Sequence, residues 1–201
     1  MSRVALSKSS LAKQNRALAT YERYLPSLDL KRKQLVAERA KALAMQEATR
    51  REMEALRAQV QEQLPMLANQ DIALADLVQV RGVQVAEENL LGTRVPVLTR
   101  LDIAVGDYGY LSTPHWVDNL VTALKRMLEL EAHLALQQRR KTLLDEAVRK
   151  VTQRVNLFDK VLIPRARQNI RRIKVYLADA ERAGIVRSKI AKNKRLREAL
   201  A

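Results

Sequence analysis

The glycines of this chain are concentrated in one place. Four of the five lie in a central stretch, at Gly82, Gly92, Gly106 and Gly109. Residues 27–64 contain neither glycine nor proline, and residues 115–183 contain no glycine and a single proline. Because these two residues are the strongest helix breakers, their distribution predicts two very long helical arms joined by a turn-rich middle. We therefore expect a mainly α-helical protein with an N-terminal arm over 1–64, a central region over 65–114 and a C-terminal arm over 115–201.

The N-terminal arm carries apolar residues at alternating steps of three and four. The series is Leu18, Tyr21, Leu25, Leu28, Leu35, Ala42 and Met45, and it resumes after a small shift as Met53, Leu56, Val60 and Leu64. This spacing is typical of a heptad seam with a stutter. Arg32 and Arg39 also fall on the seam, and Ser9 or Ser10 is expected to cap the helix. Pro26 is expected to kink the arm, since it cannot donate the usual backbone hydrogen bond.

The C-terminal arm shows a second seam. Its members are Leu144, Val148, Val151, Val155, Phe158 and Leu162, then, after a stutter across Pro164, Ile170, Ile173, Leu177, Ala180 and Gly184. Ser112 or Thr113 is expected to cap this helix, with Pro114 near its first position. A lone helix of such length needs a partner for its apolar stripe. The sequence therefore predicts a long antiparallel two-helix coiled coil formed by the two arms.

The central region changes character along its length. After Pro65, the segment MLANQDIALADLV is expected to continue as a short helix. Between 78 and 105 the residues alternate or are β-branched, which predicts short strands that form one hairpin-like β element. Pro96 argues against a central strand position there. The segment DYGYLSTP is expected to be a loop.

Charge is distributed as unevenly as glycine. The net charge is +15, with +6 in residues 1–33 and +10 in residues 160–201, whereas 65–115 is acidic with three basic and six acidic groups. If the arms pair as an antiparallel hairpin, both basic ends lie together at one tip. The densest basic run contains Arg187, Lys189, Lys192, Lys194 and Arg195.

The basic run has three interpretations. It can be a solvated helix end, where cations suit the helix dipole, a surface for an acidic protein partner, or a surface for a phosphate backbone. No aromatic residue interleaves the run to stack bases, and no recognised nucleic-acid-binding motif accompanies it. We rank the solvated end first, the protein partner second and nucleic acid third.

Residues suited to catalysis or metal binding are scarce. The chain has no cysteine and no phosphate-binding glycine loop, and it has two histidines. His133 has no acidic residue or cysteine at i+3 or i+4, and His115 has only Asp118 at i+3, which is too few ligands for a metal site. Glu87 and Glu88 are expected to mark a solvated turn rather than an acid/base pair. We therefore expect no catalytic, cofactor-binding or metal-binding residues. The sequence shows neither the apolar run of a signal peptide nor a stretch long enough to span a membrane, so we expect a cytoplasmic location.

Three motifs, in order along nearly the whole chain, resemble those of the D subunit of V-type and A-type rotary ATPases. The first arm contains Leu30-Lys31-Arg32-Lys33-Gln34-Leu35, and the middle contains an EN..G..VP segment with Asn89, Gly92 and Pro96. The C-terminal arm contains Arg154-Val155-Asn156-Leu157-Phe158 followed by an IP pair that ends in Pro164. The region from Tyr21 to Pro26 departs from the family pattern, and Gln34 replaces the usual acidic residue.

The resemblance implies a central rotor shaft, or central stalk, that binds no nucleotide itself. In that family the coiled-coil ends enter the hexameric head of catalytic and nucleotide-binding subunits. The middle faces the membrane, where it meets a small companion subunit and a socket subunit on the proton- or sodium-carrying ring. The resemblance thus implies a peripheral location in an ATPase complex, no nucleic acid and no membrane insertion. A basic tip suits a sleeve lined with acidic or carbonyl groups, so we expect Arg187, Lys189, Lys192 and Lys194 to contact the head. The alternative is a basic coiled-coil scaffold or a nucleic-acid-associated protein, which has no need of an inserted β element.

Overall fold

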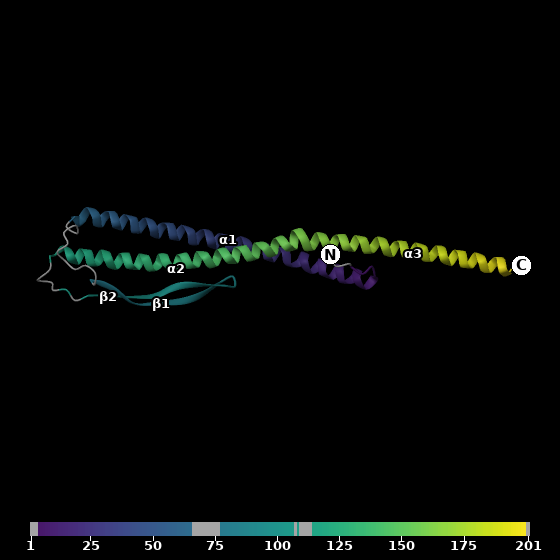
Figure 1. Cartoon of the computed structure of the whole chain (residues 1–201), viewed down its shortest axis with the longest axis horizontal. Coiled ribbons are helices and arrows are strands. Elements are labelled where there is room, and N and C mark those ends of the chain that lie inside the picture. Colours follow the sequence, from purple (N-terminus) through teal and green to yellow (C-terminus); the bar gives the residue numbers. More distant parts are fainter. Residues whose placement is uncertain (1–3, 66–76, 107, 109–113, 200–201) are drawn as a thin grey trace. The chain divides into compact units, whose positions relative to one another are not determined.

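The computed structural model describes residues 4–65, 77–106, 108 and 114–199. The described elements are the helix α1 (Lys8–Gln63), the strands β1 (Val78–Leu90) and β2 (Thr93–Val105), the helix α2 (Trp116–Leu157), the π-helical segment η2 (Phe158–Leu162) and the helix α3 (Ile163–Ala199) (Figure 1). The predicted mainly helical architecture with a β-hairpin in the middle of the chain is therefore confirmed. The expected helix over 66–78, the expected loop and the caps Ser112 and Thr113 lie wholly or mostly outside the described residues. Val78, the last residue of that expected helix, instead begins β1.

The chain divides into two compact units. One, which we call the hairpin unit, is Arg32–Lys150, and the other, the terminal unit, combines Met1–Lys31 with Val151–Ala201. Each unit contains part of α1 and part of the returning helices.

Ser7 caps α1, so the prediction of Ser9 or Ser10 was wrong. The Ser7 hydroxyl accepts a hydrogen bond from the backbone N–H of Ser10 at 3.2 Å, which satisfies one of the unpaired donors of the first turn. All three serines have the same capping chemistry, and the helix begins early enough to place Ser9 and Ser10 inside it. The helix then continues through Pro26 without ending. The bend at Pro26 stays a prediction.

The seam of α1 contains no stutter. Its buried positions are Leu35, Ala42, Gln46, Thr49 and Met53, which keep the alternation of four and three without a break. Met45, which we placed on the seam, is 58% exposed. The sequence-based seam was wrong there because it followed apolar residues alone, whereas two successive seam positions are polar. Arg32 and Arg39 are half-buried on the same stripe, as expected.

The stutter in the returning helices is real and has a local cause. In η2 the Ile163 N–H donates to the Phe158 carbonyl, five residues back rather than four. This one-residue expansion moves the buried stripe from Val155 and Phe158 to Ile163, Ala166, Ile170 and Ile173. Pro164 follows at once. Because it has no N–H to donate and its ring would clash in a regular turn, a widened turn at this point is the expected relief.

In the terminal unit, α1 and the α3 side of the chain run antiparallel. Lys8 lies 4.0 Å from Glu181, and Arg167 donates to Glu22 at 2.7 Å. The rings of Tyr21 and Phe158 meet edge to face at 5.3 Å. The buried stripe fades after Leu177, and Ala180 and Gly184, which we placed on the seam, are exposed. They lie where α1 begins, so the partner helix runs out.

In the hairpin unit, α1 and α2 also run antiparallel. Arg39 lies 3.5 Å from Asp145, and farther along α1 the hydroxyl of Thr49 meets the amide of Gln137. The base of this unit is closed by a small apolar cluster of Leu64, Leu77, Val117, Leu120 and Val121, against which Val78 and Val105 of the hairpin pack.

The two strands of the hairpin are 13 residues each, longer than the short strands we predicted. One extra residue on each strand, Arg81 on β1 and Thr99 on β2, shifts the register twice. Because opposite pairs alternate between faces, the two shifts keep four aliphatic pairs on one face: Val78–Val105, Val80–Ile103, Val83–Leu101 and Val85–Leu98. The two bulges therefore extend the ladder beyond what simple alternation in the sequence predicts.

The hairpin turn has a specific geometry. Leu91 (φ 53°) and Gly92 (φ 80°) both adopt positive φ, as a two-residue type I′ turn requires. The Asn89 side chain accepts a hydrogen bond from the Gly92 N–H at 2.8 Å. Leu91 is unusual at such a position, because a bulky side chain is strained in the left-handed region.

The seam predicts a sharp contrast between two leucines of α1. Leu35 is fully buried, whereas Leu30 is 57% exposed. We expect Leu35→Ala to lower the free energy of unfolding by about 2–5 kcal/mol, because it leaves a cavity in the seam. The same change at Leu30 should alter it by about 0.5 kcal/mol or less. Thermal unfolding followed by circular dichroism measures both, and equal losses would contradict the assigned seam.

The turn predicts opposite effects at adjacent residues. Gly92→Ala places a β-carbon at positive φ and should cost about 1–2 kcal/mol locally, so the strand amides should exchange about tenfold faster. Leu91→Asn puts a residue that tolerates this conformation in the strained position and should slow exchange. Hydrogen exchange of the β1 and β2 amides, with α2 amides as the internal reference, measures both. Similar exchange in the two variants would rule out this turn.

Candidate interaction surfaces

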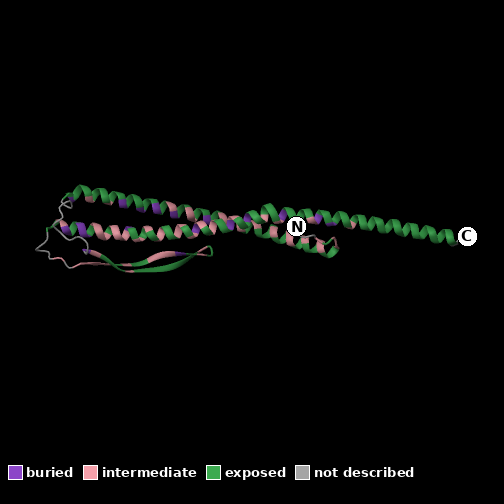
Figure 2. Ribbon diagram, viewed as in Figure 1, coloured by how far each residue is buried: buried purple, intermediate pink, exposed green. Residues whose placement is uncertain are grey.

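The predicted interaction residues Arg187, Lys189, Lys192 and Lys194 lie on the last part of α3, and all four are exposed. Every residue from 178 to 198 is exposed, as the green ribbon near the C-terminus shows (Figure 2). α1 begins at Lys8, beside Glu181, so this stretch extends past the end of the helix pairing in the terminal unit. Beyond Glu181, no other helix among the described residues packs against this stretch.

Aliphatic side chains lie among these cations. Ile185, Val186, Ile190 and Leu196 are each 52–62% exposed. A shallow groove follows one face of the helix and is lined by Gly184, Ile185, Ser188, Lys189 and Lys192, with Glu181 at its start. An exposed helix face that combines aliphatic and cationic groups is suited to bind another protein, because it offers both apolar area and charge. Sequence reasoning identified the cations and missed these aliphatic residues.

Two of the four cations already have local contacts. Lys194 lies 3.7 Å from Glu198, and the Arg187 Nε donates to the Ala183 carbonyl at 3.3 Å. Both contacts are within one turn or so of the same helix and highly exposed, so they contribute little to stability. The groups remain available to an external partner.

The motif residues of the middle form one structural group. Asn89 and Gly92 are joined by the hydrogen bond across the turn, and Pro96 pairs with Glu87 on the opposite strand. Counting from the two-residue turn, this pair is one whose backbone N–H groups point away from the partner strand, so proline costs no ladder bond there. The spacing of Asn89, Gly92 and Pro96 is therefore explained by the folding of the hairpin. The prediction that Glu87 and Glu88 mark a turn was wrong, because both lie in β1. Glu88 lies 3.7 Å from Arg140 of α2.

The motif residues of the C-terminal arm lie around the π-helical segment. Arg154 and Asn156 are exposed just before it, and Pro164 follows it. Their side chains are directed away from the seam, whereas Val155 between them is buried. This part of the motif thus combines one seam residue with exposed polar neighbours.

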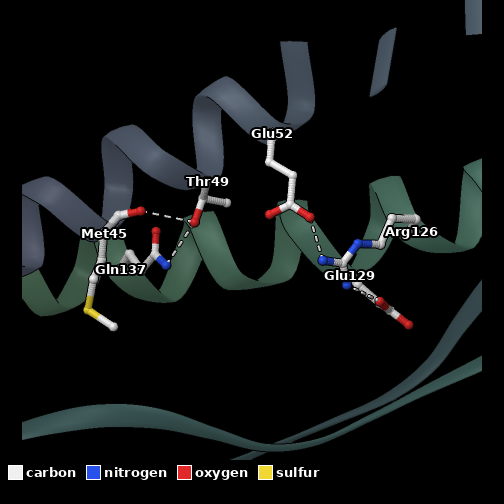
Figure 3. Close-up of polar contacts among 6 residues, drawn as sticks. All are labelled: Met45, Thr49, Glu52, Arg126, Glu129 and Gln137. Atoms are coloured by element: carbon white, nitrogen blue, oxygen red, sulfur yellow. Dashed lines mark hydrogen bonds and ion pairs between the residues drawn. The ribbon is translucent and has the colours of Figure 1, made fainter. Parts of the chain in front are cut away.

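A buried polar layer between α1 and α2 was missed by sequence reasoning. Thr49 is 9% and Gln46 is 8% exposed, both on the seam of α1. The Gln137 Nε2 of α2 donates to the Thr49 hydroxyl at 3.0 Å, and that hydroxyl donates to the Met45 carbonyl at 3.0 Å (Figure 3). The heptad phase of α1 was the signal that could have located these residues, because Gln46 and Thr49 complete it.

An ion-pair network lies next to this layer. The guanidinium of Arg126 on α2 donates to Glu52 of α1 and, at 3.0 Å, to Glu129 of its own helix (Figure 3). The hydrogen bond to Glu52, followed by that to Glu129, raises the pKa of Arg126 above its ordinary value. The groups are about half exposed, so solvent screens the attraction.

The described residues give two further results that bear on function. Within residues 4–65, 77–106, 108 and 114–199, no group of three or more His, Cys, Asp or Glu side chains is arranged to hold a metal ion. Over the same ranges, no helix combines the length and the apolar character needed to span a bilayer.

The exposure of the Arg126 network predicts a small, salt-dependent contribution. A double-mutant cycle with Glu52→Gln and Arg126→Gln should give a coupling of about 0.2–1 kcal/mol at low salt and less at high ionic strength. Arg126→Gln with Glu129→Gln is the matched cycle within one helix. Chemical denaturation measures both, and a large coupling that ignores salt would show that the network is far less hydrated than the structure indicates.

Comparison with known proteins agrees with the motifs. Residues 10–193 match the family model described as the D subunit of ATP synthase. The chain is 33% identical over 193 residues to the D subunit of the V-type ATP synthase of Borreliella burgdorferi, with 96% of this chain and 95% of the relative covered. It is 32% identical over 201 residues to the protein of the same name from Chlamydia muridarum, with 96% of each chain covered.

Proposed function

This chain belongs to the family of ATP synthase D subunits, and from that premise we propose that it is the non-catalytic central rotor of a V/A-type rotary ATPase. In this role it transmits torque between a catalytic head and a membrane ring that carries protons or sodium ions. Catalysis is assigned to the head subunits and not to residues of this chain. The complex lies on the cytoplasmic face of the membrane, with this chain peripheral to it.

The observation that carries the proposal is the exposed end of α3. A helix with Ile185 and Ile190 in solvent, set among Arg187, Lys189, Lys192 and Lys194, has apolar area without a partner in the described part of the chain. Insertion into the sleeve formed by the head subunits covers this area. Cations around it are suited to slide past acidic or carbonyl groups, because a charge contact does not demand one fixed geometry.

The hairpin supplies a second surface. Val80, Val83 and Val85 are 44–50% exposed on one face of β1. We assign this surface to the ring-side partners, the small companion subunit or the socket subunit. The family motif at the hairpin turn then also serves binding, because it shapes the hairpin whose β1 strand presents these valines.

Neutralising the four cations tests the head contact. The variant in which Arg187, Lys189, Lys192 and Lys194 are all changed to Gln should bind the catalytic head subunits about 4- to 1,000-fold more weakly, since each exposed charge contributes about 0.2–1 kcal/mol. Neutralising Arg50, Arg51, Arg149 and Lys150, which are exposed on α1 and α2, is the matched control. Co-purification and titration with head subunits measure both. Unchanged assembly and unchanged coupled turnover would sink this role for the cations.

The aliphatic residues provide a separate test. Ile185→Asn combined with Ile190→Asn should weaken assembly with the head yet leave the unfolding of the free chain unchanged, because both side chains are about 60% exposed. Ile173→Asn, at a fully buried position of the same helix, should instead destabilise the free chain. If the chain is retained on DNA in a salt-sensitive way and forms no complex with head subunits, the scaffold alternative replaces the rotor.

A further inference from the structure

The polar layer of the hairpin unit lies among the most deeply buried positions of the α1 seam, which are otherwise apolar. Between Leu35 and Met53 the buried positions of α1 pass through Gln46 and Thr49, one turn apart. Burial of a polar side chain is unfavourable unless it is hydrogen-bonded. Polar residues at seam positions of a coiled coil commonly act on alignment rather than on stability.

The hydrogen bonds of Thr49 are fully determined. Its hydroxyl donates to the Met45 carbonyl and accepts from the Gln137 amide, each at 3.0 Å (Figure 3). One partner is on the same helix and the other is on α2. The pair therefore forms at one axial alignment of the two helices.

An alignment displaced by one heptad loses this pair. It would place Gln137 opposite Ala42 or Leu56, the seam positions seven residues from Thr49, and neither side chain can form a hydrogen bond. Aliphatic contacts survive such a displacement, because aliphatic residues occupy the neighbouring seam positions as well. Discrimination between alignments thus falls to polar contacts.

The exposed ion pairs discriminate less well. Displacement would bring Arg126 opposite Met45 or Gln59 instead of Glu52, but the Arg126 and Glu52 side chains are each about half exposed and water replaces their contact. Asp145 contacts Arg39 in the structure, and in one of the two displacements it would lie opposite Arg32, so an arginine would still be its partner. The buried Thr49–Gln137 pair has no such substitute.

The pair is also not arranged for greatest stability. The Gln137 Oε1 is buried and has no hydrogen-bond partner among the described residues. An unpaired buried acceptor is costly, so an apolar pair at these positions is expected to be at least as stable. The polar pair instead favours one alignment of the two helices over the others.

We propose that Thr49 and Gln137 form a register lock, which selects one axial alignment of α1 and α2 in the hairpin unit. The alignment matters beyond the two helices, because α2 also carries Arg140, which contacts Glu88 of the hairpin. The lock therefore sets which part of α1 lies opposite the helix that positions the hairpin. This role does not depend on the partners proposed above.

The experiment uses the absence of native cysteine. Spin labels on cysteines introduced at Arg57 and Lys150, both exposed, report the alignment of the full-length chain by pulsed electron paramagnetic resonance. A displacement of one heptad moves one helix along the other by about 10 Å. The labelled wild-type background should give a single distance.

Removing the lock should release the alignment. Thr49→Val combined with Gln137→Leu should retain the helical content and thermal midpoint, while the distance distribution gains a second population displaced by about 10 Å. Thr49→Ser, which keeps the hydroxyl, and Arg126→Gln, which removes an exposed ion pair, should both keep the single distance. One unchanged narrow distance in the double variant overturns the proposal.

Moving the register lock along α1 gives a second test, in which the hydrogen-bonded pair is relocated and not removed. Thr49→Val combined with Leu56→Thr transfers the hydroxyl by one heptad, and the principal distance should shorten by about 10 Å as Gln137 pairs with the new threonine. If the principal distance stays at its original value in this variant, the hydroxyl does not select the alignment and the proposal is wrong.

Discussion

Burial at alternating steps of three and four residues along α1 is the constraint on which the helix pairing depends. Residues at these steps are withdrawn from solvent from the first turns of the helix to Leu64, and the returning helices present a matching stripe. Neither stripe is stable in water alone, so burial on each helix continues only where the partner helix covers it. Where α1 begins, the burial on α3 ends within a few residues, and the exposed end of α3 follows from that limit.

One local change of the backbone maintains this burial, and two others set the faces of the hairpin. The π-helical segment before Pro164 widens one turn and moves the stripe of the returning helix by one residue. The bulges at Arg81 and Thr99 keep four aliphatic pairs of the hairpin on one face. At each of these three places one extra residue corrects a phase that the regular geometry would lose.

Sequence reasoning predicted the arms and the hairpin because both depend on strong local signals. The absence of Gly and Pro marks the arms, and β-branched residues around Gly82 and Gly92 mark the strands. It failed where a residue occupies an environment that its polarity does not suggest. Gln46 and Thr49 are buried because the heptad phase carries them inside, although their polarity suggests the surface. The length of the strands was underestimated because each bulge interrupts the alternation used to find them. The exposed isoleucines near the C-terminus were missed because an apolar residue on a helix suggests burial unless the partner is known to end.

The central claim is that this chain turns inside the head. Because the chain has no cysteine, a single one introduced at Thr99, which is exposed on β2, can carry a bead in complexes immobilised through their head subunits. Single-molecule imaging during ATP hydrolysis then reports the motion of this chain directly. The rotor assignment predicts continuous rotation of the bead in one direction. A bead that stays fixed in complexes that hydrolyse ATP would contradict it.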